Sequence, residues 1–405
     1  MSWNAFGARG GIGAVVVAVL LAVSSCLAVA GCKDKPATTG GSGSADKPAT
    51  KTGDFVIGAY LSMTGSMADF GISTERGALI AIDEINAAGG VKGRKLALKT
   101  LDDQGKADEA GNAVTRLIDV DKADAILGEV ASSLSLVGGR IAQRRGIPMV
   151  SPSSTNSQVT AIGDYVFRAC FLDPFQGWVM AKFAREKLNA SKAAVLKDVR
   201  NDYSIGLADA FVKSFKISGG KILIEQSYGQ GDTDFSAQLT AIKAQNPDVL
   251  FLPGYYAEVG NIAKQARRLG LKMPLLGGDG WESPQLFEIG GADIVGSYFS
   301  THFAADAPGQ RAQSFIAAYK KKHGEEPTGM AALGYDGVLM IADAAKRATD
   351  SSPKALRDAL AKTQNIDAAT GKITLDAKRN PVKPAVVVKV VEKKAIFDSL
   401  VEPPS

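Results

Sequence analysis

Short apolar strands alternate with helices of amphipathic spacing through most of the chain, and this alternation constrains the fold most strongly. A strand over residues 55–61 is followed by a helix that Ser73 can cap and that Gly89-Gly90 ends. Further strands are expected at 95–101, 125–127, 147–150, 193–197, 222–226, 249–252 and 274–276, and further helices at 108–119, 135–145, 205–216, 235–244 and 259–269. Repeated strand–helix units of this kind predict an α/β protein whose parallel sheets are covered by helices on both faces.

A weak internal repeat divides the pattern into two halves. Gly89-Gly90-Val91-Lys92 and the strand and helix after it are echoed from Gly219-Gly220-Lys221 onwards, about 130 residues later. We interpret the repeat as two similar α/β lobes, although any two strand–helix units resemble each other to some degree. After Tyr298, helices at 310–323, 330–348 and 353–363 and strands at 372–376 and 385–391 are expected to complete both lobes.

The first 53 residues are expected to lie outside the fold. Arg9 is the single charge before Cys32, and residues 12–23 are apolar, so residues 1–31 are predicted to be an export signal. An uncleaved membrane anchor over 12–30 is the alternative. Residues 32–53 contain no large apolar residue after Cys32 and are predicted to form a flexible tether.

Val29-Ala30-Gly31-Cys32 resembles the lipobox of bacterial lipoproteins, in which the cysteine is acylated after the signal is cleaved. Two or more acyl chains would make a stable anchor to a bilayer. Cys26 is a weaker second candidate. Cys32 is preferred because a polar segment follows it at once.

Composition excludes several classes of function. The net charge of +5 comes largely from the N-terminus, because five basic and two acidic residues precede Gly53 and the remainder holds 42 basic and 40 acidic residues. A nucleic-acid partner is therefore not expected. With two His and three Cys, neither a multi-His metal centre nor a disulfide framework can be built, and Cys170 is expected to be buried. No phosphate-binding G-x-x-x-x-G-K-[ST] motif occurs, and His302 and His323 are better explained as structural than as catalytic residues, so we expect no enzyme and no cofactor.

Polar residues follow several strands at the edge where α/β sheets bind ligands. In the first half these are the hydroxyl-rich turns 128–133 and 151–155, whose donors suit a carboxylate. In the second half Tyr203, Tyr255 and Asp279 follow strands, and a carboxylate among aromatic rings can hold an ammonium group. Ordinary helix capping explains either turn alone, and a Gly-Asp-Gly turn explains Asp279 alone.

Several sequence blocks occur together in a recognisable order. They are Leu61-Ser62-Met63-Thr64-Gly65 with Phe70-Gly71, 81–93, Asp102-Asp103, Ser132-Ser133, 147–153, 202–206, Asp234-Phe235-Ser236, Gly254-Tyr255 with Glu258, 278–281 and Gly334-Tyr335-Asp336. Over residues 55–397 the chain thereby resembles the type I periplasmic solute-binding proteins of ABC importers, the family of leucine/isoleucine/valine-binding proteins.

The resemblance implies a binding site for an amino acid. Its carboxylate would be met by Ser132, Ser153 and Thr155, and its ammonium by Asp279, with Tyr203 and Tyr255 beside it. The side-chain pocket would be lined by the remaining candidates, Phe70, Val130, Ala131 and Trp281, of which Trp281 would close it. The family's Cys pair is replaced by Gly105 and Ala131 in this chain, and Asp279 is one methylene shorter than the family's Glu, which leaves the preferred side chain open.

The resemblance also implies the architecture and the partners. We expect two doubly wound parallel-sheet lobes, 54–170 with 301–375 and 171–300 with 376–405, joined by a three-strand hinge near Phe171, Ser300 and Leu375. The expected function is a monomeric, lipid-anchored receptor in the periplasm or on the outer face of the envelope, which delivers an amino acid, such as leucine or another apolar one, to the permease subunits of an ABC importer. A sensor of the same fold, or a receptor for an amide, a small peptide or an aromatic acid, is the alternative. A secreted hydrolase is a third class, for which the sequence supplies no convincing base.

Overall fold

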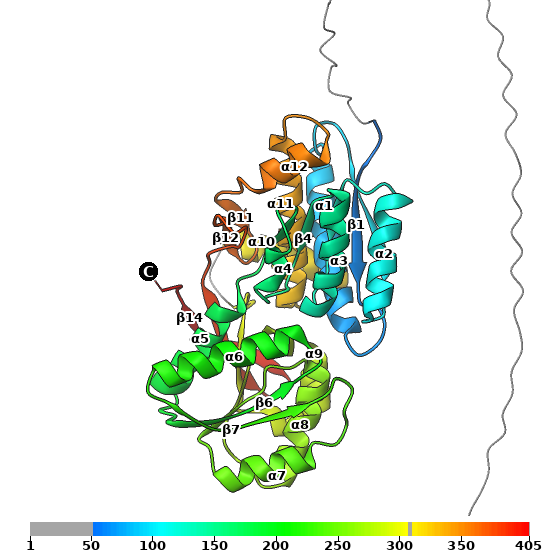
Figure 1. The fold of residues 1–405 in the computed structure, drawn as a ribbon. Coiled ribbons are helices and arrows are strands. Elements are labelled where there is room, and N and C mark those ends of the chain that lie inside the picture. Colours follow the sequence, from blue (N-terminus) through cyan, green and yellow to red (C-terminus); the bar gives the residue numbers. More distant parts are fainter. Residues whose placement is uncertain (1–51, 307–309, 405) are drawn as a thin grey trace, which may run out of the picture. The chain divides into compact units, whose positions relative to one another are not determined.

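Two sheets form the framework of the computed structural model, which describes residues 52–306 and 310–404 (Figure 1). The predicted signal, Cys26, Cys32 and nearly all of the predicted tether lie outside these residues. Within the described ranges, no helix is both long and apolar enough to cross a membrane.

Lobe 1 is built on a five-stranded sheet in the order β2-β1-β3-β4-β5, and every pair in it is parallel. Its strands are β1 (Phe55–Leu61), β2 (Leu96–Asp102), β3 (Ala125–Leu127), β4 (Met149–Ser151) and β5 (Val166–Arg168). Its helices are α1 (Ala68–Ala87), α2 (Ala107–Asp119), α3 (Ser132–Arg145), α4 (Gln158–Ala161), α10 (Gln310–His323), α11 (Gly329–Arg347) and α12 (Pro353–Leu360), with a small hairpin of β11 (Ile366–Ala368) and β12 (Gly371–Ile373). Six of the seven residues of β1 are buried, as expected for a central strand that helices cover on both faces.

Lobe 2 is built on a seven-stranded sheet in the order β14-β13-β10-β9-β8-β6-β7. Its strands are β6 (Lys192–Asp198), β7 (Lys221–Tyr228), β8 (Val249–Phe251), β9 (Leu275–Gly277), β10 (Tyr298–Thr301), β13 (Ala385–Val391) and β14 (Lys394–Val401). Its helices are α5 (Asp173–Glu186), α6 (Asp202–Ile217), α7 (Ser236–Gln245), α8 (Tyr256–Arg268) and α9 (Pro284–Gly290), and the 3-10 turns η1 (Asp279–Trp281) and η2 (Gly291–Ile294) accompany them. The α/β class and the paired-lobe architecture predicted from the sequence are confirmed.

The C-terminal hairpin makes the second sheet mixed rather than wholly parallel. β13 runs antiparallel to β10, and β14 runs antiparallel to β13. The sequence analysis predicted β13 but not β14. The two-residue turn between them holds Lys393 at a φ of 60°. Gly or Asn usually occupies such a position in a hairpin, so the sequence lacks the usual signal for this turn.

The chain passes between the two sheets three times: after β5, after β10 and after β12. The hinge positions expected near Phe171, Ser300 and Leu375 lie in or beside these passages. Movement about them, and the residue boundaries proposed for the lobes, stay predictions.

Several helices begin earlier than the sequence pattern predicted. α1 starts at Ala68, so Ser73 is a buried residue inside the helix and the prediction that it caps α1 is wrong. α3, α6 and α8 each begin three residues before their predicted starts. Residues that were expected in the turns after β3, β6 and β8 are therefore the first residues of these helices. The first turns of helices therefore lie at the sheet edges where ligands bind.

Helices α1 and α11 are far apart in sequence but pack side by side in lobe 1 (Figure 1). Two glycines allow their backbones to come this close. A Cβ on Gly77 would lie 1.8 Å from the Ala331 carbonyl oxygen, and one on Gly334 would lie 2.2 Å from that of Thr74. These positions tolerate no side chain without separating the helices.

Gly77→Ala is therefore expected to lower the free energy of unfolding by about 1–3 kcal/mol, as overpacking does. The matched control is Gly111→Ala in α2, where the added Cβ would meet Val137 at an ordinary 3.6 Å. The control should be neutral or should stabilise by up to about 1 kcal/mol through helix propensity. Urea denaturation of both variants measures the difference, and equal stability of the two would contradict the close packing.

Candidate functional site

A cavity of about 200 Å³ lies where the carboxyl ends of the two sheets face each other. Its lining comes from both lobes and consists of Phe70, Val130, Ser153, Tyr203, Tyr255, Asp279, Gly280 and Met330. Six of the ten predicted ligand-binding residues are in this lining. Ala131, Ser132 and Thr155 lie within two residues of lining residues in the same two turns of lobe 1, and Trp281 is not part of the lining.

Lobe 1 contributes hydrogen-bond donors to the site. α3 begins at Ser132, and its first intrahelical bonds are donated by Leu134 and Ser135 to the Ala131 carbonyl, so the N–H of Ser132 precedes them. The Ser132 hydroxyl accepts the N–H of Asn156 at 3.3 Å. The Ser153 hydroxyl is buried and has no hydrogen-bond partner within the described part of the chain. A helix N-terminus with hydroxyls beside it suits a carboxylate.

Other hydroxyls of the same turns hold the loop in shape. Ser135, Ser151 and Ser154 all donate to the carbonyl oxygen of Glu129, at 2.9, 2.8 and 2.9 Å. The buried Glu129 carboxylate accepts the N–H of Ser62 at 3.0 Å. Burial, reinforced by the nearby Asp103, holds the pKa of Glu129 well above its ordinary value. Glu129 thus fixes the turn that presents Val130 and Ser132.

Lobe 2 contributes a buried carboxylate. Asp279 is 2% exposed, and the Gln176 amide donates to its Oδ1 at 2.9 Å. The Nε2 atom of His302 lies 3.0 Å from its Oδ2. The sequence analysis did not identify Gln176, because the helix that carries it was not predicted. His302 directly follows β10, so the strand-end rule applied to the other candidates would have identified it as well.

Two tyrosines lie beside this carboxylate. The Tyr203 and Tyr255 rings stack with centroids 5.4 Å apart and planes within 9°. The Tyr203 hydroxyl accepts the N–H of Gly280 at 3.0 Å. A side chain at Gly278 would collide with that hydroxyl, since a Cβ there would lie 2.7 Å from it. The glycines around Asp279 therefore let the tyrosines approach.

The structure corrects the role predicted for Trp281. Its indole is fully buried in lobe 2, packs against Gly277 and Phe299, and donates from Nε1 to the Leu252 carbonyl at 3.0 Å. Trp281 is therefore a core residue that supports the Asp279 turn and does not close the pocket. The wall that it was expected to supply comes in part from Met330, in the first turn of α11, which sequence reasoning missed.

Asp173, in the first turn of α5, is a second buried carboxyl near the site. Burial raises its pKa to about 8, and the Asp279 charge adds to the rise, while the Thr155 hydroxyl and Arg168 oppose it. Asp173 is thus largely neutral at pH 7.

The lobes contact each other beside the cavity. The Ser133 hydroxyl donates to Oδ2 of Asp202 at 2.8 Å, and the Asn156 amide donates to the Asp202 carbonyl at 2.7 Å. Phe70 of lobe 1 meets the Tyr255 ring edge to face at 5.4 Å. Ser133, Asn156 and Asp202 each neighbour a predicted ligand-binding residue in sequence.

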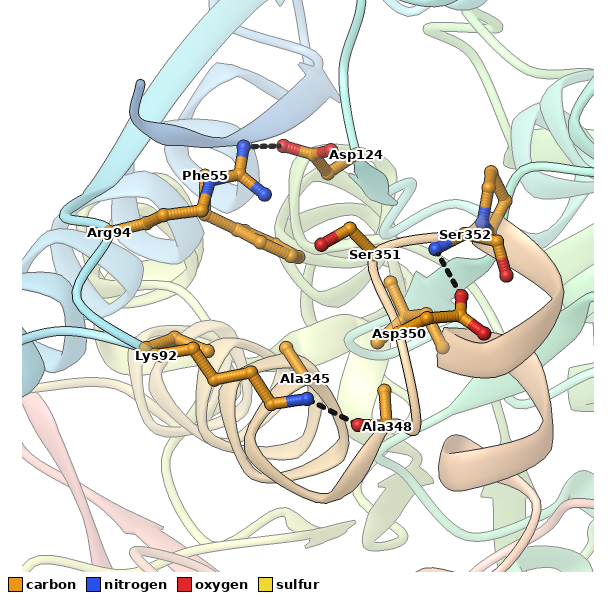
Figure 2. Close-up of a pocket in the computed structure, with 12 residues that line it drawn as sticks. Phe55, Lys92, Arg94, Asp124, Ala345, Ala348, Asp350, Ser351 and Ser352 are labelled. Carbon is orange, nitrogen blue, oxygen red and sulfur yellow. Dashed lines mark hydrogen bonds and ion pairs between the residues drawn. The ribbon is translucent and has the colours of Figure 1, made fainter. Parts of the chain in front are cut away.

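A second hollow, of about 580 Å³, lies at the opposite edge of the lobe 1 sheet (Figure 2). Its charged side chains are engaged with the protein: Arg94 donates to Asp124 at 2.8 Å, and Lys92 donates to the Ala348 carbonyl. It lies at the amino ends of the strands, where α/β folds rarely bind ligands, so it is not our candidate. Among the described residues, no group of three or more His, Cys, Asp or Glu side chains could hold a metal ion. Cys170 is free and buried, as predicted.

The raised pKa of Asp173 predicts a pH-dependent stability. Because the unfolded carboxyl titrates near about 4 and the folded one at about 8, the folded state binds more protons between these values. The contribution of Asp173 to the free energy of unfolding therefore falls as pH rises from 4 to 8, by up to about 1.4 kcal/mol per pH unit. Asp173→Asn should gain stability relative to the parent protein between pH 5 and pH 8, measured by urea denaturation without ligand.

Asp209→Asn, at an exposed carboxyl of α6, is the control and should keep the parent's pH dependence. An Asp173→Asn variant that also kept it would show that Asp173 is ionised throughout this range.

A family model of periplasmic binding proteins matches residues 55–395. A curated relative, Leu/Ile/Val-binding protein homolog 3 of Brucella melitensis, is 33% identical over 325 residues, which cover 79% of this chain and 87% of the relative. The structure of a leucine-binding protein from Thermotoga maritima is 39% identical with a TM-score of 0.83, and the match covers 86% of this chain and 99% of that one.

The structure of a branched-chain amino acid transporter substrate-binding protein from Streptococcus pneumoniae, in complex with isoleucine, is 36% identical with a TM-score of 0.82, over 86% of this chain and 100% of that one. Two Rhodopseudomonas palustris solute-binding proteins, 23% and 24% identical and solved with benzoate and 3,4-dihydroxybenzoic acid, show the fold alone. Since the family model spans the strands of both sheets up to the start of β14, the chain belongs to the periplasmic binding proteins, as the order of its sequence blocks predicted.

Proposed function

We propose that this chain is a lipid-anchored extracytoplasmic receptor that binds an amino acid with an apolar side chain between its lobes and delivers it to an ABC importer. The observation that carries the proposal is that a buried carboxylate, Asp279, and the unpartnered hydroxyl of Ser153, close to the start of α3, line one small cavity from opposite lobes. A zwitterion satisfies both ends at once, and burying either end without the other leaves an unpaired polar group.

The cavity lining supports a small apolar side chain. Phe70, Val130, Met330 and the Tyr255 ring supply carbon surface around this small space. A single amino acid suits this space better than a peptide. The relatives named for leucine, isoleucine and valine support the same class of ligand.

An aromatic acid is the second candidate, and the stacked tyrosines favour it. Such a ligand would leave Asp279 without a cationic partner, so the ammonium group distinguishes the two candidates. A sensor would bind the same ligand, and uptake of labelled leucine by cells with and without the gene separates transport from sensing.

Asp279→Asn is expected to weaken leucine binding by at least about 100-fold, since removing one partner of a buried charge pair costs about 3–5 kcal/mol. Titration calorimetry with leucine, 4-methylpentanoate and benzoate measures the effect. The two ligands without an amine should bind the parent protein weakly, and their affinities for the variant should be about the same as for the parent. A folded variant with unchanged leucine affinity would exclude Asp279 as the ammonium partner, and tight benzoate binding without leucine binding would favour the second candidate.

The lipid anchor is tested separately. Cys32→Ser should move the protein from the membrane fraction to the soluble fraction and abolish incorporation of a labelled fatty acid, because acyl chains on Cys32 supply the membrane affinity. Cys26→Ser is the matched control and should stay at the membrane. Loss of labelling in Cys26→Ser alone would transfer the proposed anchor to Cys26.

A further inference from the structure

The Asp279 carboxylate is contacted by two side chains that are not part of the cavity lining. Gln176 donates to one oxygen and His302 contacts the other, at 2.9 and 3.0 Å. A carboxylate offers about four lone-pair sites, so each oxygen keeps a site for a ligand in the cavity. Gln176 is an uncharged donor, and the role of the pair depends on whether His302 is uncharged too.

The His302 ring is fixed in position. It is 3% exposed and stacks on Phe171, with the ring centroids 3.7 Å apart and the planes 29° from parallel. Phe171 is in turn packed edge to face against Phe175. The ring therefore cannot turn away from Asp279 without disrupting the aromatic packing at the start of α5.

The hydrogen bonds assign the proton on this ring. The Asp279 carboxylate is an acceptor, so Nε2 must carry the hydrogen that lies between them. Nδ1 is buried and has no hydrogen-bond partner within the described part of the chain, so a proton there would be unsatisfied.

The surroundings also oppose a charge on His302. Burial lowers its pKa to about 4, although Asp279 acts in the opposite direction, and the buried Lys383 adds to the lowering. A cationic histidine would neutralise Asp279 and compete with a ligand's ammonium group. A neutral histidine donates a hydrogen bond and leaves the negative charge to the ligand.

We propose that His302 is a positioning residue that, together with Gln176, orients the Asp279 carboxylate and so makes the site select ligands that carry an ammonium group. This inference rests on the proposed function, because it requires an amino acid in the cavity. It goes beyond that function in one respect. A side chain that touches Asp279 and does not line the cavity determines how well the site distinguishes a ligand with an amine from one without it.

The test compares His302→Leu with His302→Gln by titration calorimetry. His302→Leu removes the donor and keeps an apolar group beside Phe171, and it should weaken leucine binding about 10- to 100-fold, as loss of a hydrogen bond to a charged group does. Binding of 4-methylpentanoate should not change, since that ligand has no ammonium group. His302→Gln can place an amide N–H where Nε2 stood, and its leucine affinity should lie closer to the parent's than to that of His302→Leu.

The state of the ring is measured directly. The chain has two histidines, so in a His323→Gln background the imidazole ¹⁵N spectrum reports His302 alone. At pH 7 it should show a neutral ring protonated at Nε2. A cationic ring, or one protonated at Nδ1, would overturn the proposal.

The outcomes separate the two proposals. If the parent protein binds no amino acid, the proposed function fails. If the parent binds leucine and His302→Leu binds it equally well, the proposed function stands and the role of His302 fails. Equal losses for leucine and 4-methylpentanoate would make His302 a purely structural residue and would also overturn the inference.

Discussion

A buried carboxylate with uncharged partners is the constraint on which the site depends. Gln176 and His302 both hydrogen-bond to the Asp279 carboxylate, and a neutral His302 adds no positive charge beside it. Burying such a group is costly unless a cation completes it. The other features of the site follow from this need. The glycines around Asp279 admit Tyr203, and the opposite lobe holds donors that suit the other end of a zwitterion.

The helix starts proposed to bind the ligand also join the two lobes. Ser132 and Ser133 are neighbours at the start of α3, and Asp202 and Tyr203 are neighbours at the start of α6. One member of each pair is a candidate ligand-binding residue, while the other joins the lobes through the bond from Ser133 to Asp202. A ligand that orders these turns would therefore also favour contact between the lobes. This arrangement supplies a physical route from binding to closure of a two-lobed protein.

The sequence predicted the fold, and its strand-end residues meet at the cavity that we propose as the site, because strand–helix alternation and the strand-end rule depend on local patterns. It did not predict features that arise from packing between distant segments. Helices α3, α6 and α8 begin earlier than predicted, since residues assigned to the preceding turns belong to their first turns. Met330 and Gln176 reach the site from elements whose placement depends on the complete topology.

Trp281 and His302 show that separation along the sequence does not predict which side chains meet Asp279. Trp281 is next but one to Asp279 in sequence, yet its indole bonds to Leu252 in the core. His302 is 23 residues from Asp279 and lies against its carboxylate. Proximity in sequence says little about the side of a turn to which a side chain points, and that side is decided by the neighbouring strands β8, β9 and β10.

A crystal structure with bound leucine tests the central claim most directly. The account predicts the leucine nitrogen within about 3 Å of an Asp279 carboxylate oxygen, the leucine carboxylate at the start of α3, and the side chain among Phe70, Val130 and Met330. Leucine bound with its carboxylate toward Asp279, or bound outside this cavity, would contradict the account.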